Sequence, residues 1–77
     1  MIYTLERLKE LMPGDWDTIR SNQINYYILS CETTMVSIWC EKGKFDLSKG
    51  TRMLELDKDL ETALKWYKLH FKLKNFA

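Results

Sequence analysis

Two runs of strand-forming residues, separated by a short polar turn, constrain the fold of this chain more than any other feature. Residues 23–31 read QINYYILSC and contain no acidic or basic side chain, and residues 35–41 read MVSIWCE. Both runs are rich in the aliphatic and aromatic residues that favour strands, whereas Glu32-Thr33-Thr34 between them is polar. A hairpin decides which side chains share a face, so we expect the rest of the chain to be organised around it.

Shorter strand-like segments follow this hairpin. Lys42-Gly43-Lys44 predicts a second turn, because glycine at position 43 can adopt a positive φ. Residues 45–47 begin a third strand, Ser48-Lys49-Gly50 form either a loop or a bulge, and residues 51–56 complete the sheet. The segment 18–20 carries only a weak strand signal, and Asp15–Thr18 is expected to be a connector. The sequence therefore predicts an antiparallel meander of three strands, with the last one continuous or broken.

A helix is expected at each end of the chain. The first is indicated by apolar residues at helical spacing, namely Leu5, Leu8, Leu11 and Met12. We expect Thr4 to be its N-cap, Tyr3 to pack on Leu8, and Pro13-Gly14 to end it. The second runs over residues 58–74, with Asp57 or Asp59 as its cap. Seventy-seven residues suffice for one domain. The fold class predicted is a single α+β domain over residues 1–77, in the order αβββα.

The closing helix has apolar residues on two of its sides. One stripe is typical of a helix that packs on a sheet, and its members are Leu60, Ala63, Leu64, Tyr67 and Phe71. A second stripe contains Trp66, Leu69, Leu73 and Phe76, with Lys65 in the polar arc that separates the two. Either the first helix covers the second stripe through Leu5, Leu8 and Met12, or the stripe is exposed to a protein partner or a second copy of the chain.

The hairpin offers another candidate surface. With a three-residue turn at 32–34, one face would be the core and would hold Ile24, Tyr26, Ile28, Val36, Ile38 and Cys40. The other face would hold Tyr27, Leu29, Met35 and Trp39, of which Tyr27, Met35 and Trp39 are candidate partner-binding residues. In this register the two cysteines, Cys31 and Cys40, lie on opposite faces and too far apart for a disulfide. We expect both to be free thiols with a packing role.

Nucleic-acid binding is the alternative function. Lys42, Lys44, Lys49 and Arg52 cluster along the chain, and aromatic residues on a sheet face could stack on bases. However, twelve basic residues are balanced by eleven acidic ones, for a net charge of +1, whereas a protein that contacts many phosphates normally shows a clear positive excess. A nucleic-acid interface is therefore the second hypothesis rather than the first.

Searches for catalytic chemistry find no candidate constellation. The chain has no glycine-rich phosphate loop, no G-x-S-x-G and no H-E-x-x-H. Its one histidine, His70, has no evident triad partner, and two cysteines with one histidine fall short of a closed metal site. We expect no enzymatic activity, cofactor or metal. There is also no signal-peptide pattern and no long apolar span, which predicts a cytoplasmic protein.

Three features give the chain a resemblance to a known group of proteins. They are the order of its elements, its abundance of lysine and aromatic residues, and the closing run Leu54-Glu55-Leu56-Asp57 through Glu61-Thr62-Ala63-Leu64-Lys65-Trp66-Tyr67. It resembles the short accessory proteins of Gram-positive phages and prophages, which act in host takeover or against host defence. The resemblance implies a protein of the bacterial cytoplasm that binds and disables a host protein, including defence nucleases. Our first hypothesis is accordingly a small non-enzymatic protein-binding module that inhibits by steric occlusion.

Overall fold

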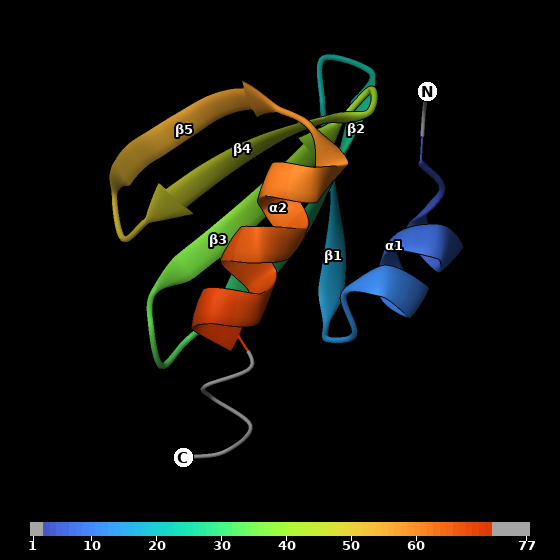
Figure 1. The fold of residues 1–77 in the computed structure, drawn as a ribbon. Helices are drawn as coiled ribbons and strands as arrows, with labels where there is room; N and C mark the ends of the chain where they lie inside the picture. Colours follow the sequence, from blue (N-terminus) through green and yellow to red (C-terminus); the bar gives the residue numbers. More distant parts are fainter. Residues whose placement is uncertain (1–2, 72–77) are drawn as a thin grey trace.

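The computed structural model describes residues 3–71 as a curved antiparallel sheet with helices on one of its faces (Figure 1). The elements are α1 (Leu5–Leu11), β1 (Trp16–Ser21), β2 (Ile24–Cys31), β3 (Val36–Glu41), β4 (Lys44–Lys49), β5 (Arg52–Lys58), α2 (Leu60–Trp66) and the π-helical turn η1 (Tyr67–Phe71). The strands are ordered β1-β2-β3-β4-β5 in space, so each strand pairs with its neighbour in sequence. The α+β class is confirmed, but the predicted three-stranded meander is wrong because the sheet has five strands.

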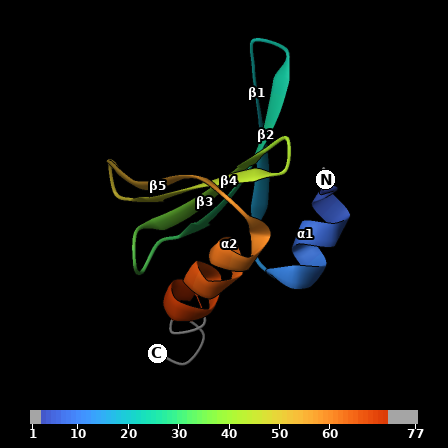
Figure 2. The same ribbon diagram turned by 45° about the horizontal axis from the view of Figure 1, so that its top comes forward.

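The first additional strand, β1, replaces most of the connector expected after α1. A turn at Asn22 and Gln23 joins it to β2, and both residues have positive φ angles of 50° and 66°. Asparagine tolerates this left-handed backbone better than most residues, and a turn of this hand suits the twist of a hairpin. Figure 2 shows the β1–β2 hairpin projecting beyond the rest of the sheet. Without a glycine at the turn, the sequence signal for this hairpin was weak.

The second additional strand comes from a turn at Gly50 and Thr51, where a loop or bulge within one strand was expected. Gly50 has a φ of 62° in this turn, and Lys49 pairs directly with Arg52 across it. The amide of Gly50 also donates a hydrogen bond of 2.8 Å to the carbonyl of Met35 in the β2–β3 loop. The segment 45–56 is therefore a hairpin, and β5 becomes the outer strand of the sheet.

The β2–β3 pairing differs by one residue from the predicted register. Met35 belongs to the loop, with a φ of 64°, and its amide donates to the Cys31 carbonyl at 2.8 Å. Cys31 consequently pairs with Val36, whereas a three-residue turn would have paired it with Met35. Because neighbouring side chains in a strand point to opposite faces, a slip of one residue turns every side chain of β2 over. Tyr27 and Leu29 therefore lie on the face predicted for Tyr26 and Ile28.

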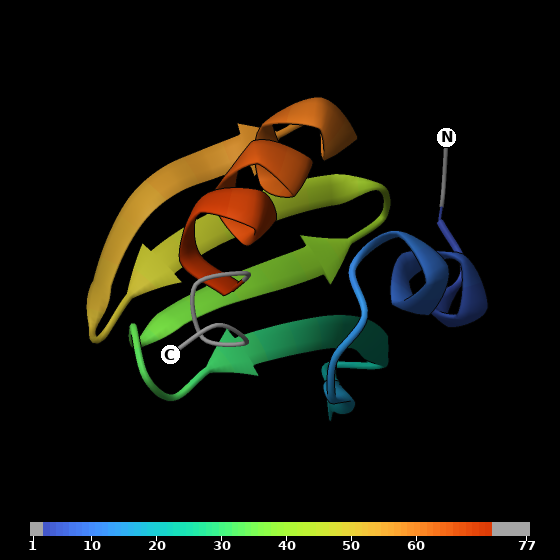
Figure 3. The ribbon, with the colours of Figure 1, turned by 60° about the horizontal axis from the view of Figure 1, so that its bottom comes forward.

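Both helices pack on one face of the sheet, which we call the covered face. α2 crosses this face over β3 and β4, and α1 lies beside β1 (Figure 3). The buried cluster combines residues of α1, the covered face and the closing helix, namely Leu8, Met12, Trp16, Leu29, Cys31, Val36, Ile38, Cys40, Phe45, Leu47, Ala63 and Phe71. The two cysteines are not joined by a disulfide. They share this face, contrary to the prediction, with Cys31 opposite Val36 and Cys40 opposite Tyr27.

The capping signals of both helices are confirmed. The Thr4 side chain accepts from the Arg7 amide at 3.2 Å, and the Asp59 carboxylate accepts from the Thr62 amide at 2.9 Å. Of the two candidate caps of the closing helix, Asp59 is the one used. Tyr3 contacts the Phe45 ring at 6.0 Å between centroids, where a contact with Leu8 was expected. The closing helix begins at Leu60, two residues later than predicted, and its predicted end at residue 74 lies outside the described residues.

Candidate protein-binding surface

The face opposite the helices, which we call the open face, has a row of four side chains across β1, β2, β3 and β4. Asp17 pairs with Ile28, Ile28 with Trp39, and Trp39 with Asp46. Paired residues in antiparallel strands point to the same side, so this row places two apolar side chains between two carboxylates. The four strands span about 14 Å at a spacing of roughly 4.8 Å. This row is the centre of the candidate site.

Trp39 is held in place by neighbours on the open face. Its indole lies edge-on to the Tyr26 ring, with centroids 6.5 Å apart and an interplanar angle of 82°. Its Nε1–H donates to Ser48 Oγ at 3.3 Å, and Ser48 is itself buried. Ile28 beside it is only 7% exposed although no helix covers it. An edge-to-face aromatic pair and a satisfied indole N–H stabilise this cluster without help from the covered face.

A bulge in β5 extends the apolar part of the open face. Met53 pairs with Ser48 on the open face, whereas Glu55 pairs with Leu47 on the covered face, so an extra residue, Leu54, lies between the two pairs. Such a bulge shifts the alternation of side chains by one position. Leu56, next to Glu55, therefore returns to the open face together with Met53. These two side chains are 58% and 51% exposed.

Carboxylates lie around the apolar Ile28–Trp39 pair at the centre of the open face. Asp17 and Asp46 end the central row, and Glu41 lies next to Lys44 across the β3–β4 turn. Within residues 3–71 neither Asp17 nor Asp46 is in an ion pair; Asp46 accepts a hydrogen bond of 3.0 Å from the amide of Asp57. The Ile28–Trp39 pair thus has an acidic rim, and Met53 and Leu56 of β5 lie on the open face beyond Asp46.

The structure separates the hairpin residues that were predicted to share a partner-binding surface. Trp39 is on the open face, as expected, but Tyr27 packs against the buried cluster on the covered face. Met35 lies in the β2–β3 loop and is 60% exposed. The predicted face of Tyr27, Met35 and Trp39 is therefore wrong as a single surface, because it depended on the slipped register.

The second stripe of the closing helix is only partly described. Trp66 is half-buried against the core, and its ring lies tilted by 35° against the His70 ring at a centroid distance of 4.9 Å. Leu69 is 61% exposed, so α1 does not cover it, and Lys65 is exposed on α2. Leu73 and Phe76 lie outside the described residues. Among residues 3–71 the stripe therefore contributes one strongly exposed apolar side chain, fewer than the open face.

The basic residues of the alternative hypothesis do not come together. Lys42 and Lys44 lie at the β3–β4 turn, whereas Lys49 and Arg52 lie at the β4–β5 turn. The length of β4 separates the two pairs by about 17 Å at roughly 3.4 Å per residue. The register also places Lys44 on the open face and Lys49 on the covered face. Neither face therefore has a continuous basic area next to Tyr26 and Trp39.

On the covered side the Cys31 thiol approaches the backbone of His70 and not its ring. The Sγ of Cys31 lies 3.9 Å from the backbone carbonyl oxygen of His70, whose ring instead lies against Trp66. Burial raises the pKa of the Cys40 thiol to about 11, so almost none of it is thiolate near neutral pH. Among residues 3–71 no group of three or more potential ligands is placed to hold a metal ion.

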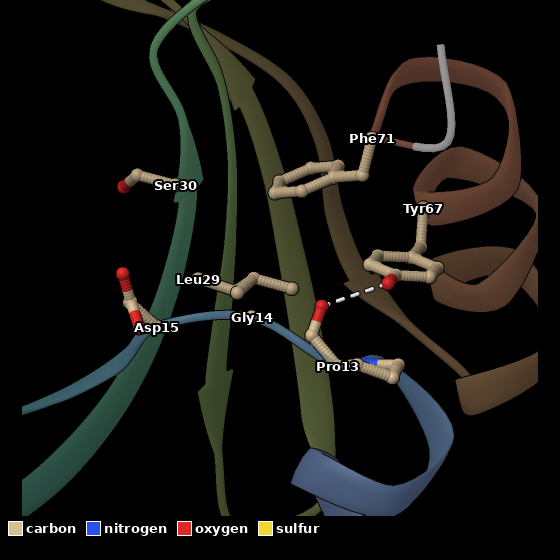
Figure 4. A pocket seen from close by; sticks show the side chains of 7 residues that line it. All are labelled: Pro13, Gly14, Asp15, Leu29, Ser30, Tyr67 and Phe71. Carbon is tan, nitrogen blue, oxygen red and sulfur yellow. Dashed lines mark hydrogen bonds between the residues drawn. The ribbon is translucent and has the colours of Figure 1, made fainter. Parts of the chain in front are cut away.

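A small cavity lies where the closing helix meets the loop between α1 and β1 (Figure 4). Its volume is about 150 Å³, and it is lined by Pro13, Gly14, Asp15, Leu29, Ser30, Tyr67 and Phe71. The Tyr67 hydroxyl donates to the Pro13 carbonyl at 2.7 Å, and its ring stacks on Phe71 with centroids 5.2 Å apart. Burial raises the pKa of Tyr67. These contacts fasten the helix to the loop.

Sequence reasoning missed most of the open face. Tyr26 and Ile28 were assigned to the core, Ile19 belonged to a weak strand segment, and Met53 and Leu56 belonged to a strand with no assigned role. The sequence signal that could have found this face is Trp39 together with the acidic residues Asp17 and Asp46 on other strands. These three residues fall into one row only when the register of the strands is known. A four-residue loop at 32–35 supplies that register.

Comparison of the chain with protein-family models, with curated proteins and with solved structures finds no match. Across the described part of the chain, no helix combines the length and apolar character needed to cross a membrane. The functional argument therefore depends on the geometry of the surface.

Proposed function

We propose that this chain is a small non-enzymatic protein-binding module that docks a partner protein on its open face. The observation behind the proposal is the apolar open face itself, which no helix within residues 3–71 covers. Ile19, Met53 and Leu56 lie on it and are 45%, 51% and 58% exposed. Apolar side chains gathered on one face and bordered by polar groups are typical of protein interfaces.

Trp39 is the proposed anchor of this interface. Tryptophan and tyrosine contribute disproportionately to binding energy, and the Trp39 ring is already held by Tyr26 and Ser48. A side chain that is fixed before binding loses little conformational entropy on binding. The pair Trp39 and Tyr26 therefore supplies a preorganised aromatic surface with Ile28 beneath it.

The acidic rim indicates the chemistry of the partner. Asp17 and Asp46 lie at the two ends of the central row, about 14 Å apart by strand spacing. A complementary surface would place an apolar side chain over Trp39 and basic side chains beside the carboxylates. Such charge pairs mainly increase the association rate and the specificity of a complex. The same rim disfavours nucleic acid on this face, so the nucleic-acid alternative is not developed.

Inhibition by occlusion is the proposed mode of action. A domain of this size bound through a sheet face would cover the area of the partner beneath it without any chemical step. The resemblance to phage accessory proteins suggests a bacterial host protein as the partner. This identification is part of the proposal, and it depends on the resemblance alone.

The test begins with capture of a partner from a bacterial lysate on the immobilised chain, followed by purification of that partner. Calorimetric titration then compares wild type with Trp39→Ala and Asp17→Lys. Loss of a central aromatic anchor costs about 2 kcal/mol or more, so we expect Trp39→Ala to weaken binding by about thirtyfold. Asp17→Lys should slow association and reduce its dependence on salt.

Leu69→Ala is the matched control, because it removes an exposed apolar side chain from the helix side. We expect its affinity to stay within about twofold of wild type. Thermal unfolding of every variant shows whether each is folded. If the partner bound Trp39→Ala as tightly as wild type but no longer bound Leu69→Ala, the interface would lie on the closing helix and the proposal would be contradicted.

A further inference from the structure

The outer edge of the sheet at β5 has three exposed apolar side chains among its seven residues. β5 is the last strand in the sheet order, and no strand lies on its outer side within residues 3–71 (Figure 1). Met53 is 51% exposed, Leu54 42% and Leu56 58%, and the other four residues of the strand are charged. Exposed edge strands normally have charged or inward-turned side chains, because an apolar edge invites pairing with another chain.

The opposite edge shows what such protection looks like. All residues of β1 after Trp16 are exposed, and Asp17, Thr18, Arg20 and Ser21 are polar. Ile19 is the single large apolar side chain among them. The apolar character of β5 is therefore not a general property of the edges of this sheet.

The charges of β5 complement those of a second β5 strand that runs in the opposite direction. The strand begins at the exposed Arg52 and reaches the exposed Asp57 near its end. In an antiparallel pair centred between Leu54 and Glu55, Arg52 of each copy comes near Asp57 of the other, and Met53 of each copy faces Leu56 of the other. Lys58 does not offset the charge attraction fully, since its ammonium already lies 3.1 Å from the Glu55 carboxylate. The strand is thus self-complementary in charge and hydropathy at these four positions.

We propose that a second copy of this chain docks on the β5 edge, so that two antiparallel β5 strands join two sheets in a homodimer. The proposal goes beyond the partner-binding function, because the second copy pairs with the edge of the sheet. Met53 and Leu56, which also belong to the open face, would then lie beside their counterparts with no layer over them. The two-fold axis of such a pair is perpendicular to the sheet, so both open faces point to the same side. A dimer would therefore present two docking faces to a partner at once, which raises avidity.

The bulges of β5 limit the strength of this dimer. The register shifts twice, between the pairs of Phe45 and Leu47 and between those of Leu47 and Ser48, and bulges bend a strand and shorten any ladder that can be added to it. Stable dimers bury about 800 Å² on each partner, which is far more than three half-exposed side chains provide. We therefore expect reversible association in the micromolar range or weaker.

Sedimentation equilibrium of the full chain over a wide concentration range tests this inference. The weight-average mass should rise from 9.3 kDa toward twice that value as concentration increases. Leu56→Lys should weaken self-association by about tenfold or more, because it puts a charge into the apolar contact. Ile19→Lys, the same change on the β1 edge, should alter it by no more than about twofold.

A second pair of variants tests the charge pairing. Arg52→Glu removes the attraction to Asp57 of the other copy, whereas Lys9→Glu makes the same change of net charge at an exposed position of α1. We expect Arg52→Glu to weaken the dimer at least about fivefold more than Lys9→Glu at low salt, and the difference to shrink at high salt. A chain that stays monomeric at millimolar concentration, or a dimer that Ile19→Lys disrupts as strongly as Leu56→Lys, would overturn the inference.

Discussion

The two faces of the sheet are made by the same strands and differ in how their apolar side chains are shielded. In β3 the covered face receives Val36, Ile38 and Cys40, which are essentially inaccessible to solvent, whereas Ser37 and Trp39 on the open face are half-buried. Helices shield the covered face, so aliphatic side chains suffice there. The open face shields itself with aromatic rings and hydrogen bonds. One face thus forms the buried core, and the other keeps apolar side chains that are exposed to solvent.

Two tryptophans show the same difference in a single residue type. Trp16 on the covered side is 6% exposed, and its Nε1–H donates to the Met12 carbonyl at the end of α1, at 2.9 Å. Trp39 donates instead to Ser48 on the adjacent strand. A buried indole N–H needs an acceptor, and the open face supplies one without a covering helix. The open face is therefore structurally complete without an added layer.

The largest effect expected from this comparison is at Phe45, which is fully buried on the covered face. Phe45→Ala should cost about 3–5 kcal/mol, because it removes an aromatic ring and leaves a cavity. A domain this small has little stability to spare, so the thermal midpoint measured by circular dichroism should fall by at least about 15 °C. Met53→Ala on the open face should change the free energy of unfolding by less than about 0.5 kcal/mol. Similar losses at both positions would remove the distinction between the faces.

Tyr26 and Tyr27 test the comparison at adjacent positions on opposite faces. Tyr27 packs against the buried cluster, whereas Tyr26 contacts Trp39 on the open face. We expect Tyr27→Ala to cost about 2 kcal/mol or more, and Tyr26→Ala about 1 kcal/mol, the value of an edge-to-face aromatic pair. Urea unfolding measures both. Only Tyr26→Ala should also weaken partner binding. The reverse order of stabilities would support the register with a three-residue turn.

These tyrosines also show how far the sequence could predict the fold. The apolar composition of residues 23–31 and 35–41 identified both of these strands, and the alternation within β3 assigned its faces correctly. In β2, however, Ile24, Tyr26 and Ile28 are as apolar as Tyr27, Leu29 and Cys31. Both faces of β2 therefore looked like a core, and only the loop length could decide between them. Met35 in a left-handed conformation has no sequence signal, since bulky residues seldom adopt it.

The site was predictable only in part for the same reason. Trp39 was identified as an exposed aromatic residue because β3 alternates clearly, and it remains the proposed anchor. Its neighbours Ile28 and Asp46 come from other strands, so recognising them required the register on both sides of β3. The bulge at Leu54, which brings Met53 and Leu56 to one face, follows from a geometry that no periodicity in residues 51–56 reveals. Local sequence patterns predicted the helices and several strands, whereas the residues that make up the open face depend on how the strands pair.

The smallest effect expected is a pH dependence of the stability, and it should arise from His70 on the covered side. Burial, and to a lesser degree the nearby Lys49 ammonium, lowers the pKa of His70 below its ordinary value of about 6.5. Between the two pKa values the unfolded chain binds more protons than the folded one, so stability falls as the pH falls through that window. Urea midpoints at about pH 7.5 and 5.5 should differ in this direction, and His70 is the sole histidine.

His70→Phe is the control for this titration, because it keeps an aromatic ring against Trp66 and removes the ionisable group. Its urea midpoint should depend less on pH over the same range, since the variant has no imidazole that can take up a proton. Binding through Trp39 on the other face should stay unchanged by the substitution at either pH. An equal loss of stability on acidification in wild type and His70→Phe would mean that another group titrates, and the covered face would then lack the sensitivity assigned to it.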